Sequence, residues 1–193
     1  MEDKVAKKSV IRGKVIVPAV VAALAAILLC ASYFMPLTTA KEDLIVMSEF
    51  AQTYEVNEGS GLTMGDLSNP SIVTWARFYK AYCDRLGIPV TSSLNDGSVM
   101  FWVIVASGVA AGLVLLFAVL RKAVPTTLFA LVNFGLISLV GYYFESYGPV
   151  SSGAASEWAF GHVVMIGSAI IAAAAGVWLF IAKRVQKKAD TTV

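Results

Sequence analysis

The stretch from residue 99 to residue 120, VMFWVIVASGVAAGLVLLFAVL, contains no charged side chain and decides the class of this protein. As an α-helix rising 1.5 Å per residue, it is about 33 Å long, enough to cross a bilayer core of about 30 Å. Three further apolar runs cover residues 15–35, 128–144 and 158–181. The sequence therefore predicts an all-α membrane protein built as a bundle of four transmembrane helices.

The composition of the chain agrees with this class. Of its 193 residues, 58% are hydrophobic and only 15% are charged, whereas a soluble domain carries roughly 25% charged residues. A soluble protein of this size would leave much of that apolar surface in contact with water. We therefore expect the lipid bilayer to be the main surroundings of the chain.

The basic residues are unevenly distributed and predict an orientation. Eleven of the fifteen Lys and Arg residues lie in the flanking segments 1–14, 121–127 and 182–193. The intervening segments 36–98 and 145–157 hold the other four, among many carboxylates. Because Lys and Arg are retained on the cytoplasmic side, we expect both termini and the short turn in the cytoplasm. The location expected is the plasma (inner) membrane, with the other two segments outside the cell.

The first apolar run, residues 15–35, has a second interpretation. Basic residues precede it and Thr38-Thr39-Ala40 follows it, as in a cleaved signal peptide. The apolar core of a signal peptide is normally about 7 to 15 residues long, and this run is longer. An uncleaved first span is the interpretation we favour.

Small residues recur at helical spacing in the apolar runs. Gly108 and Gly112 lie in the second run, and Ser168, Ala172 and Gly176 lie in the fourth. Helices surrounded by lipid associate through close backbone approach at such positions. We expect these residues to pack the four helices against each other within one chain. The alternative is homodimerisation through the two glycines.

Neutral polar residues are the only hydrogen-bonding side chains near the middle of the runs. They include Asn133, Ser107 and Ser138. A charge at this depth costs several kcal/mol and usually marks transport or catalysis, so its absence disfavours a proton-coupled pump. A hydrogen bond between helices is the simplest role for Asn133, and a lining position in a pore or pocket is the alternative.

The outer segment 36–98 is expected to fold as a small helical hairpin between the first and second spans. Thr39 is followed three residues later by Glu42, which matches a capping box, and apolar residues then fall on one helical face as far as Tyr54. This pattern predicts a first short helix.

A second outer helix is expected from Asn69-Pro70, an N-cap followed by a first-turn proline, to Gly87. Its apolar stripe is widened by Trp75, Phe78 and Tyr82. These rings fit the membrane rim, where amphipathic aromatic residues are favourable. They also fit anchors for a partner protein, because Trp and Tyr are frequent in binding hot spots.

The sequence offers only weak evidence for a catalytic or metal-binding site. Glu145, Glu157 and His162 are the residues available for an acid–base or metal site near the outer ends of the spans. One histidine without a second ligand at suitable spacing is poor evidence for a metal, and we favour an interfacial imidazole. Cys30 and Cys83 are too far apart in the expected topology to form a disulfide. No cofactor, metal or catalytic site is therefore expected.

Two classes of function follow from these observations. The first is a non-catalytic membrane accessory or scaffold protein, whose partner is another membrane protein or a second copy of the chain. The second is an oligomeric small channel or carrier with a neutral polar path along Asn133, Ser138 and Ser107. An enzyme is not expected, nor is a nucleic-acid partner.

Overall fold

The described part of the chain forms five α-helices, one 3-10 helix and two short strands. The computed structural model describes residues 2–41, 53–56, 58–90, 96–154 and 156–191, with 2–14 and 189–190 described by their helical backbone alone. Four helices are long and apolar enough to cross a membrane, as a multi-pass membrane protein requires. They are α1 (Glu2–Ser32), α4 (Asp96–Val119), α5 (Ala123–Ser146) and α6 (Phe160–Thr191). The predicted helical class with four apolar spans is confirmed, and the two strands are an addition to it.

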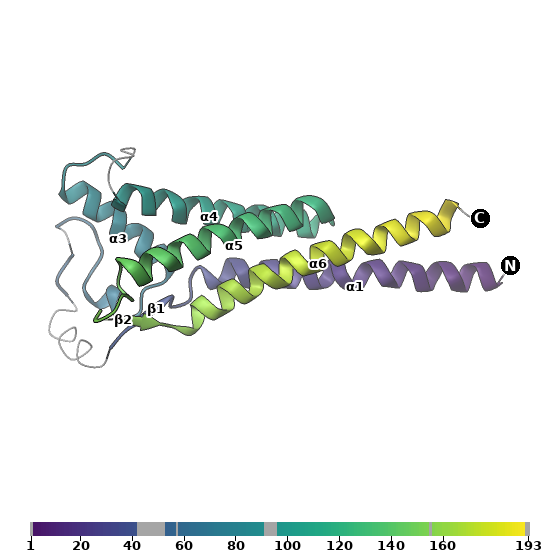
Figure 1. Cartoon of the computed structure of the whole chain (residues 1–193), viewed down its shortest axis with the longest axis horizontal. Helices are drawn as coiled ribbons and strands as arrows, with labels where there is room; N and C mark the ends of the chain where they lie inside the picture. Colours follow the sequence, from purple (N-terminus) through teal and green to yellow (C-terminus); the bar gives the residue numbers. More distant parts are fainter. Residues whose placement is uncertain (1, 42–52, 57, 91–95, 155, 192–193) are drawn as a thin grey trace.

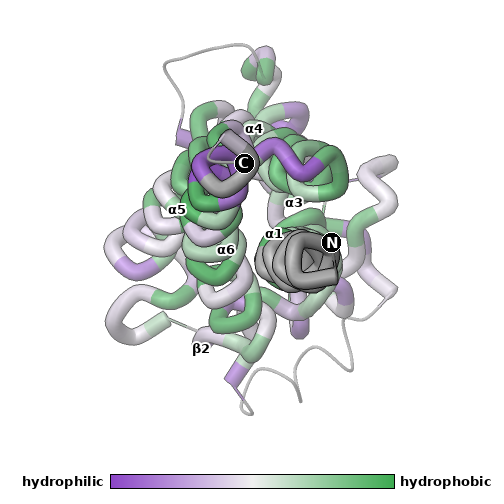
Figure 2. The backbone as a smooth tube through the Cα atoms, turned by 90° about the vertical axis from the view of Figure 1, so that its right-hand side faces the viewer, coloured by the Kyte–Doolittle hydropathy of each residue, from purple (hydrophilic) through white to green (hydrophobic). Residues whose placement is uncertain are grey.

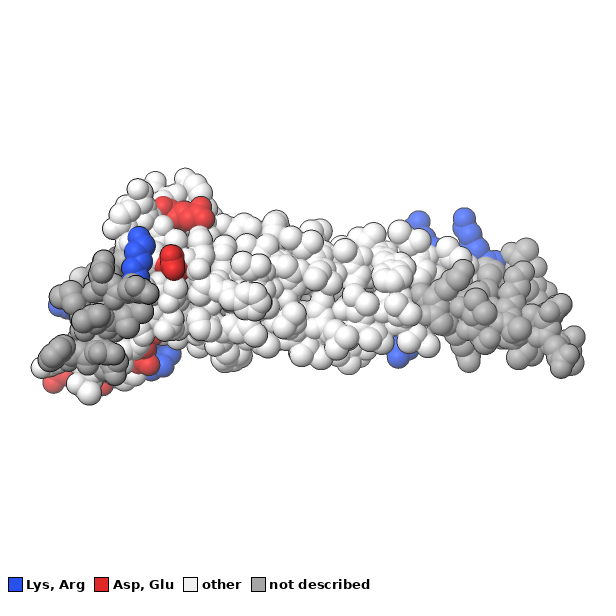
Figure 3. All heavy atoms as spheres, turned by 90° about the horizontal axis from the view of Figure 1, so that it is seen from below, with Lys and Arg blue, Asp and Glu red and all other residues white. Residues whose placement is uncertain are grey.

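The four long helices run side by side along the long axis of the molecule (Figures 1 and 2). The start of α1 and the end of α6 lie at one end, and α3 (Ile72–Arg85) lies at the other with strands β1 and β2. On the face drawn in Figure 3, charged residues lie toward the two ends and the middle carries none. This distribution matches a protein whose middle third sits in hydrocarbon.

Small residues bring the helices close together, as the sequence predicts. Ala22 and Ala26 of α1 and Ala172 of α6 are fully buried. A Cβ added at Gly176 of α6 would come within 3.1 Å of the backbone nitrogen of Thr127 in α5. These helix faces therefore pack within one chain.

The two glycines of α4 face different surroundings. A Cβ at Gly108 would lie 3.7 Å from Cε1 of Tyr33, so this position packs against the end of α1. A Cβ at Gly112 would meet nothing within 4 Å, and this residue is exposed. Gly108 thus serves packing inside the bundle, whereas Gly112 faces the surroundings of the bundle.

A tight turn joins α4 to α5. Arg121 adopts the left-handed backbone conformation, with φ of 54°, and the next amide, Lys122 N–H, donates to the carbonyl of Phe117 over 2.8 Å. This is a Schellman-type helix end in a position that usually requires glycine. The carbonyl of Arg121 accepts a hydrogen bond from the Lys183 ammonium of α6. Because α5 already begins at Ala123, the connection is shorter than the predicted segment 121–127.

The first outer segment begins as a strand, not as a helix. Strand β1 (Thr38–Ala40) pairs antiparallel with β2 (Ser156–Trp158), which precedes α6, and Thr38 lies opposite Trp158. The predicted N-cap role of Thr39 is therefore wrong, because pairing with a distant segment has overridden the local pattern. Most of the expected first helix falls in residues 42–52, outside the described residues, and Tyr54 lies in a bend after them.

Helix α3 is the second predicted outer helix, and it starts later than expected. Its N-cap is Ser71, whose hydroxyl accepts a hydrogen bond from Thr74 N–H over 3.2 Å. The predicted N-cap, Asn69, instead accepts a hydrogen bond from the Thr39 hydroxyl through its side-chain oxygen. The helix ends as predicted next to Gly87, whose φ of 64° suits glycine.

Replacing Gly176 by alanine tests the close approach of α6 to α5. We expect Gly176→Ala to lower the free energy of unfolding by about 1–3 kcal/mol, because the added methyl group meets backbone atoms that cannot move freely. The measurement is reversible unfolding in mixed micelles. Gly112→Ala is the matched control, and its helix should be unchanged or slightly stabilised by the loss of a glycine. Equal effects of the two substitutions would contradict the described packing.

Candidate binding site

Helix α3 is fixed to the bundle by its tryptophan. Trp75 is only 7% exposed, and its indole N–H donates to the hydroxyl of Thr38 in β1 over 3.2 Å. The ring meets Phe144 of α5 edge-on, with 5.1 Å between centroids. Phe144 in turn stacks on Trp158 of β2, and Trp158 stacks on His162 of α6. We call Trp75, Phe144, Trp158 and His162 the aromatic ladder, and it joins α3, α5, β2 and α6.

Of the predicted candidates for acid–base or metal chemistry, Glu145 and His162 both contact Trp158 and interact electrostatically, whereas Glu157 does not join them. His162 lies flat against Trp158, with 3.7 Å between the ring centroids. Glu145 accepts a hydrogen bond from the indole N–H of Trp158 over 3.1 Å, whereas Glu157 is exposed on β2 opposite Thr39. Among the described residues, no group of three His, Cys, Asp or Glu side chains is placed to hold a metal ion.

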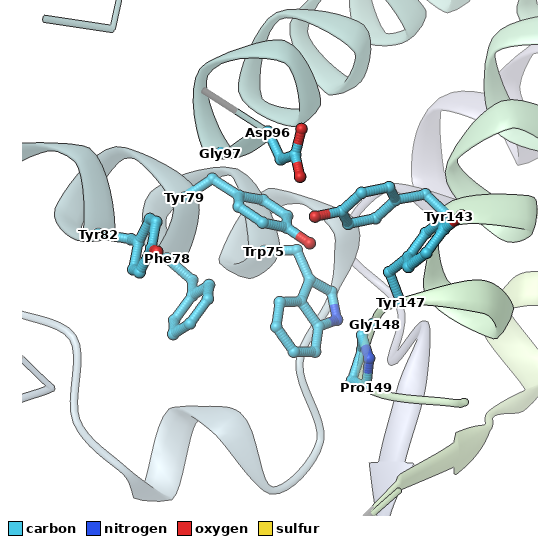
Figure 4. A pocket seen from close by; sticks show the side chains of 10 residues that line it. All are labelled: Trp75, Phe78, Tyr79, Tyr82, Asp96, Gly97, Tyr143, Tyr147, Gly148 and Pro149. Carbon is cyan, nitrogen blue, oxygen red and sulfur yellow. The ribbon is translucent and has the colours of Figure 1, made fainter. Parts of the chain in front are cut away.

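A cavity of about 520 Å³ opens between α3, the first turn of α4 and the end of α5 (Figure 4). Six aromatic side chains and one carboxylate lie on its walls. Its lining residues are Trp75, Phe78, Tyr79, Tyr82, Asp96, Gly97, Tyr143, Tyr147, Gly148 and Pro149. This volume lies in the range of small-molecule sites.

Helical spacing explains how the aromatic wall forms. Phe78, Tyr79 and Tyr82 follow Trp75 by three, four and seven residues, which places the four rings on one face of α3. Tyr143 and Tyr147 add a second wall from the end of α5, where Gly148 lets the chain turn sharply. A Cβ at Gly148 would lie only 2.7 Å from the Cα of Phe144, so no other residue fits there without a shift of the backbone.

The electrostatics of the cavity depend on Asp96. This exposed carboxylate lies in the first turn of α4 and is the only charged group among the described residues that line the cavity. In Figure 4 the hydroxyl groups of Tyr79 and Tyr143 point toward one another beneath it. Burial raises the pKa of Tyr79, and the nearby Tyr143 raises it further. Tyr79 is therefore neutral at physiological pH, and the cavity carries one negative charge.

The polar residues predicted for the membrane interior form a sealed node at the centre of the bundle. Asn133 of α5 is fully buried, and its amide nitrogen donates to the Tyr33 hydroxyl over 2.9 Å and to the Ser107 carbonyl over 2.7 Å. This node joins α1, α4 and α5. Ser138 is exposed on the outside of α5 and does not join it. Ser168 of α6 is 2% exposed, and its hydroxyl has no hydrogen-bond partner among the described residues.

The sequence did not predict the cavity, but three aromatic residues proposed from it as partner anchors lie there. The three aromatic residues singled out from it, Trp75, Phe78 and Tyr82, all line the cavity, although Trp75 is buried within the chain while Tyr82 is 44% exposed. Sequence reasoning missed Asp96 and Tyr143 as site residues. The only signals for them were a turn-forming Asn-Asp-Gly and an aromatic cluster at the outer end of a span.

Comparison of this chain with models of protein families, with curated proteins and with solved structures gives no match. The site must therefore be interpreted from its own geometry.

The polar node predicts an energetic coupling between α1 and α5. We expect Tyr33→Phe and Asn133→Ala each to lower the free energy of unfolding, and the double variant to lose less than the sum. The coupling energy should be about 0.6 to 2 kcal/mol, as for hydrogen bonds between membrane helices. Ser138→Ala, on the outside of α5, is the control and should change stability little. Strict additivity of the two node substitutions would contradict the hydrogen bond.

Proposed function

We propose that this chain is a non-catalytic membrane accessory protein that holds a fixed interaction surface on the extracytoplasmic side for a partner membrane protein. The observation that carries this proposal is that the two sides of α3 have different contacts. One side of the helix is fastened to the bundle through buried Trp75, and another side presents an apolar stripe outward. A surface held in one orientation loses little entropy when it binds.

The outward stripe is formed by Phe78, Tyr82 and Leu86, which follow one another at intervals of four residues. Tyr82 is 44% exposed and Leu86 is 49% exposed, and the rings of Phe78 and Tyr82 stack with 6.5 Å between centroids. We call these three residues the α3 stripe. Exposed aromatic and aliphatic side chains next to a cavity are typical of an interface core.

A channel or carrier function has less support. Asn133 and Ser107, two of the three residues of the suggested polar path, are fully buried and hydrogen-bonded to one another within one chain. Ser138 lies on the outside of the bundle. A path along all three would require the node to open, with the loss of two hydrogen bonds in a medium that cannot replace them.

We propose that the chain lies in the plasma (inner) membrane. The cavity and α3 then face the extracytoplasmic side, and both ends of the chain lie in the cytoplasm. Lys183 and Arg184 at one end of the bundle support this orientation through the positive-inside rule. The carboxylates at the other end fit an outer surface, because acidic residues are tolerated there.

Cysteine labelling tests this orientation. In a chain with Cys30→Ala and Cys83→Ala, we expect Ser152→Cys to react with a membrane-impermeant maleimide on intact cells. Lys187→Cys should react only after the membrane is permeabilised. Both positions are exposed, so a difference in labelling reports the side of the membrane. The reverse pattern would invert the proposed topology.

Mild-detergent purification from native membranes tests the accessory function. We expect a stoichiometric second protein to copurify, and Tyr82→Ala combined with Leu86→Ser to reduce its recovery at least about tenfold, as for hot-spot side chains. Met64→Ala removes an outer side chain that is 44% exposed but lies off α3, and recovery should stay unchanged. A partner-free homo-oligomer whose solute flux in liposomes is altered by Asn133→Leu would overturn the proposal in favour of a channel.

A further inference from the structure

The cavity beside α3 has the chemical character of a cation site. Its walls are the rings of Trp75, Phe78, Tyr79, Tyr82, Tyr143 and Tyr147. The face of an aromatic ring carries partial negative charge and attracts a cation within about 6 Å of its centre. Rings contributed by α3 and α5 line the same cavity in Figure 4, so a cation inside it would lie near several rings.

The net charge of the cavity favours the same kind of ligand. Asp96 supplies one carboxylate, and no Lys or Arg is found among the described residues of the lining. Two of the three basic residues of α3 are engaged elsewhere. Lys80 forms an ion pair with Asp84 over 2.7 Å, and Arg77 donates to the carbonyl of Gly61 over 2.8 Å. The third, Arg85, does not line the cavity, and Asp96 forms no ion pair within the described part of the chain.

The size of the cavity and the groups on its walls limit which kinds of cation could bind there. A hard metal ion such as Ca²⁺ requires six to eight oxygen ligands, and one carboxylate with four tyrosine hydroxyls provides fewer. A primary ammonium or guanidinium group is held mainly by hydrogen-bond acceptors, whereas six rings on the lining favour a cation that makes its contacts through methyl groups. An alkylated ammonium group has no N–H donors, is small enough to enter a cavity of about 520 Å³, and is recognised by aromatic cages.

We propose that the cavity lined by Trp75, Tyr79, Tyr143 and Asp96 binds a quaternary ammonium group of the choline type. The ligand group enters from the extracytoplasmic side, its methyl groups lie against the rings, and its charge faces Asp96. At the outer end of the spans, such a group is supplied either by a lipid headgroup or by a free solute. The site goes beyond the proposed accessory function, although it shares Phe78 and Tyr82 with the α3 stripe.

Choline binding to the full-length protein in phosphatidylglycerol nanodiscs tests the site. The affinity is measured by saturation-transfer NMR on the methyl signal, and 3,3-dimethylbutan-1-ol serves as a neutral ligand of the same shape. We expect the neutral compound to bind at least about tenfold more weakly, because it lacks the charge that the rings and Asp96 recognise. Equal affinities of the unmodified protein for the two compounds would overturn the proposal.

Variants locate the binding within the molecule. We expect Asp96→Asn and Tyr143→Leu each to weaken choline binding about fivefold or more, since each removes one attractive group. Glu157→Gln, an exposed outer carboxylate outside the cavity, should leave the affinity within about twofold. Unchanged binding in both cavity variants, with the helical circular dichroism signal retained, would overturn the assignment to this cavity.

Lipid composition distinguishes the two sources of the ligand. Lower apparent affinity for added choline in phosphatidylcholine nanodiscs than in phosphatidylglycerol nanodiscs supports the site with a lipid headgroup as its occupant. The same affinity in both supports it with a free solute as occupant. Recovery of the partner protein is measured separately on the Asp96→Asn variant, which keeps the α3 stripe, so failure of the cation site and failure of the accessory function give different results.

Discussion

Helices inside a bilayer gain nothing by hiding apolar side chains from one another, because lipid tails are as apolar as leucine. The bundle is held instead by close backbone contact and by a few hydrogen bonds. Ala26, Ala172 and Gly176 provide the contact, and the node at Asn133 joins three helices through two hydrogen bonds from a single amide nitrogen. Both donor bonds of the Asn133 amide are used in packing the bundle, whereas its side-chain oxygen is buried with no hydrogen-bond partner among the described residues. The cavity lies elsewhere, at the end of the bundle that carries α3.

Where water is present, burying apolar side chains is favourable again. At the end of the bundle that carries α3, large aromatic rings, not small residues, therefore join the elements. The aromatic ladder runs from α3 to α6 and includes Trp75, whose ring is buried while its N–H is hydrogen-bonded. The same helix supplies the cavity wall and the α3 stripe, so one buried tryptophan orients both surfaces. The short sheet adds a second connection between α1 and α6 at the end of the bundle that carries α3.

Hydrophobicity and helical spacing were sufficient to predict the four apolar helices and the aromatic face of α3, because each depends on residues close together in the chain. They did not distinguish Gly176, which packs against α5, from Gly112, which is exposed. What the sequence could not supply were contacts between distant segments. Thr39 matched a local capping pattern, yet β1 pairs with residues 156–158. The hydrogen bond from Asn133 to the Tyr33 hydroxyl joins residues 100 positions apart. Asp96 joined the cavity only because α3 folds back over the start of α4.

The pairing of β1 with β2 also has a consequence for how the protein is made. Strand β1 leaves the insertion machinery directly after the first span, but its partner emerges only shortly before the last one. During synthesis the edge of β1 is therefore unpaired while two further spans are inserted, and contacts between segments so distant in the chain form slowly. An unpaired strand edge is a template for association with other chains. The sheet therefore forms only late in synthesis, once residues 156–158 have been made, and β1 stays without its partner strand until then.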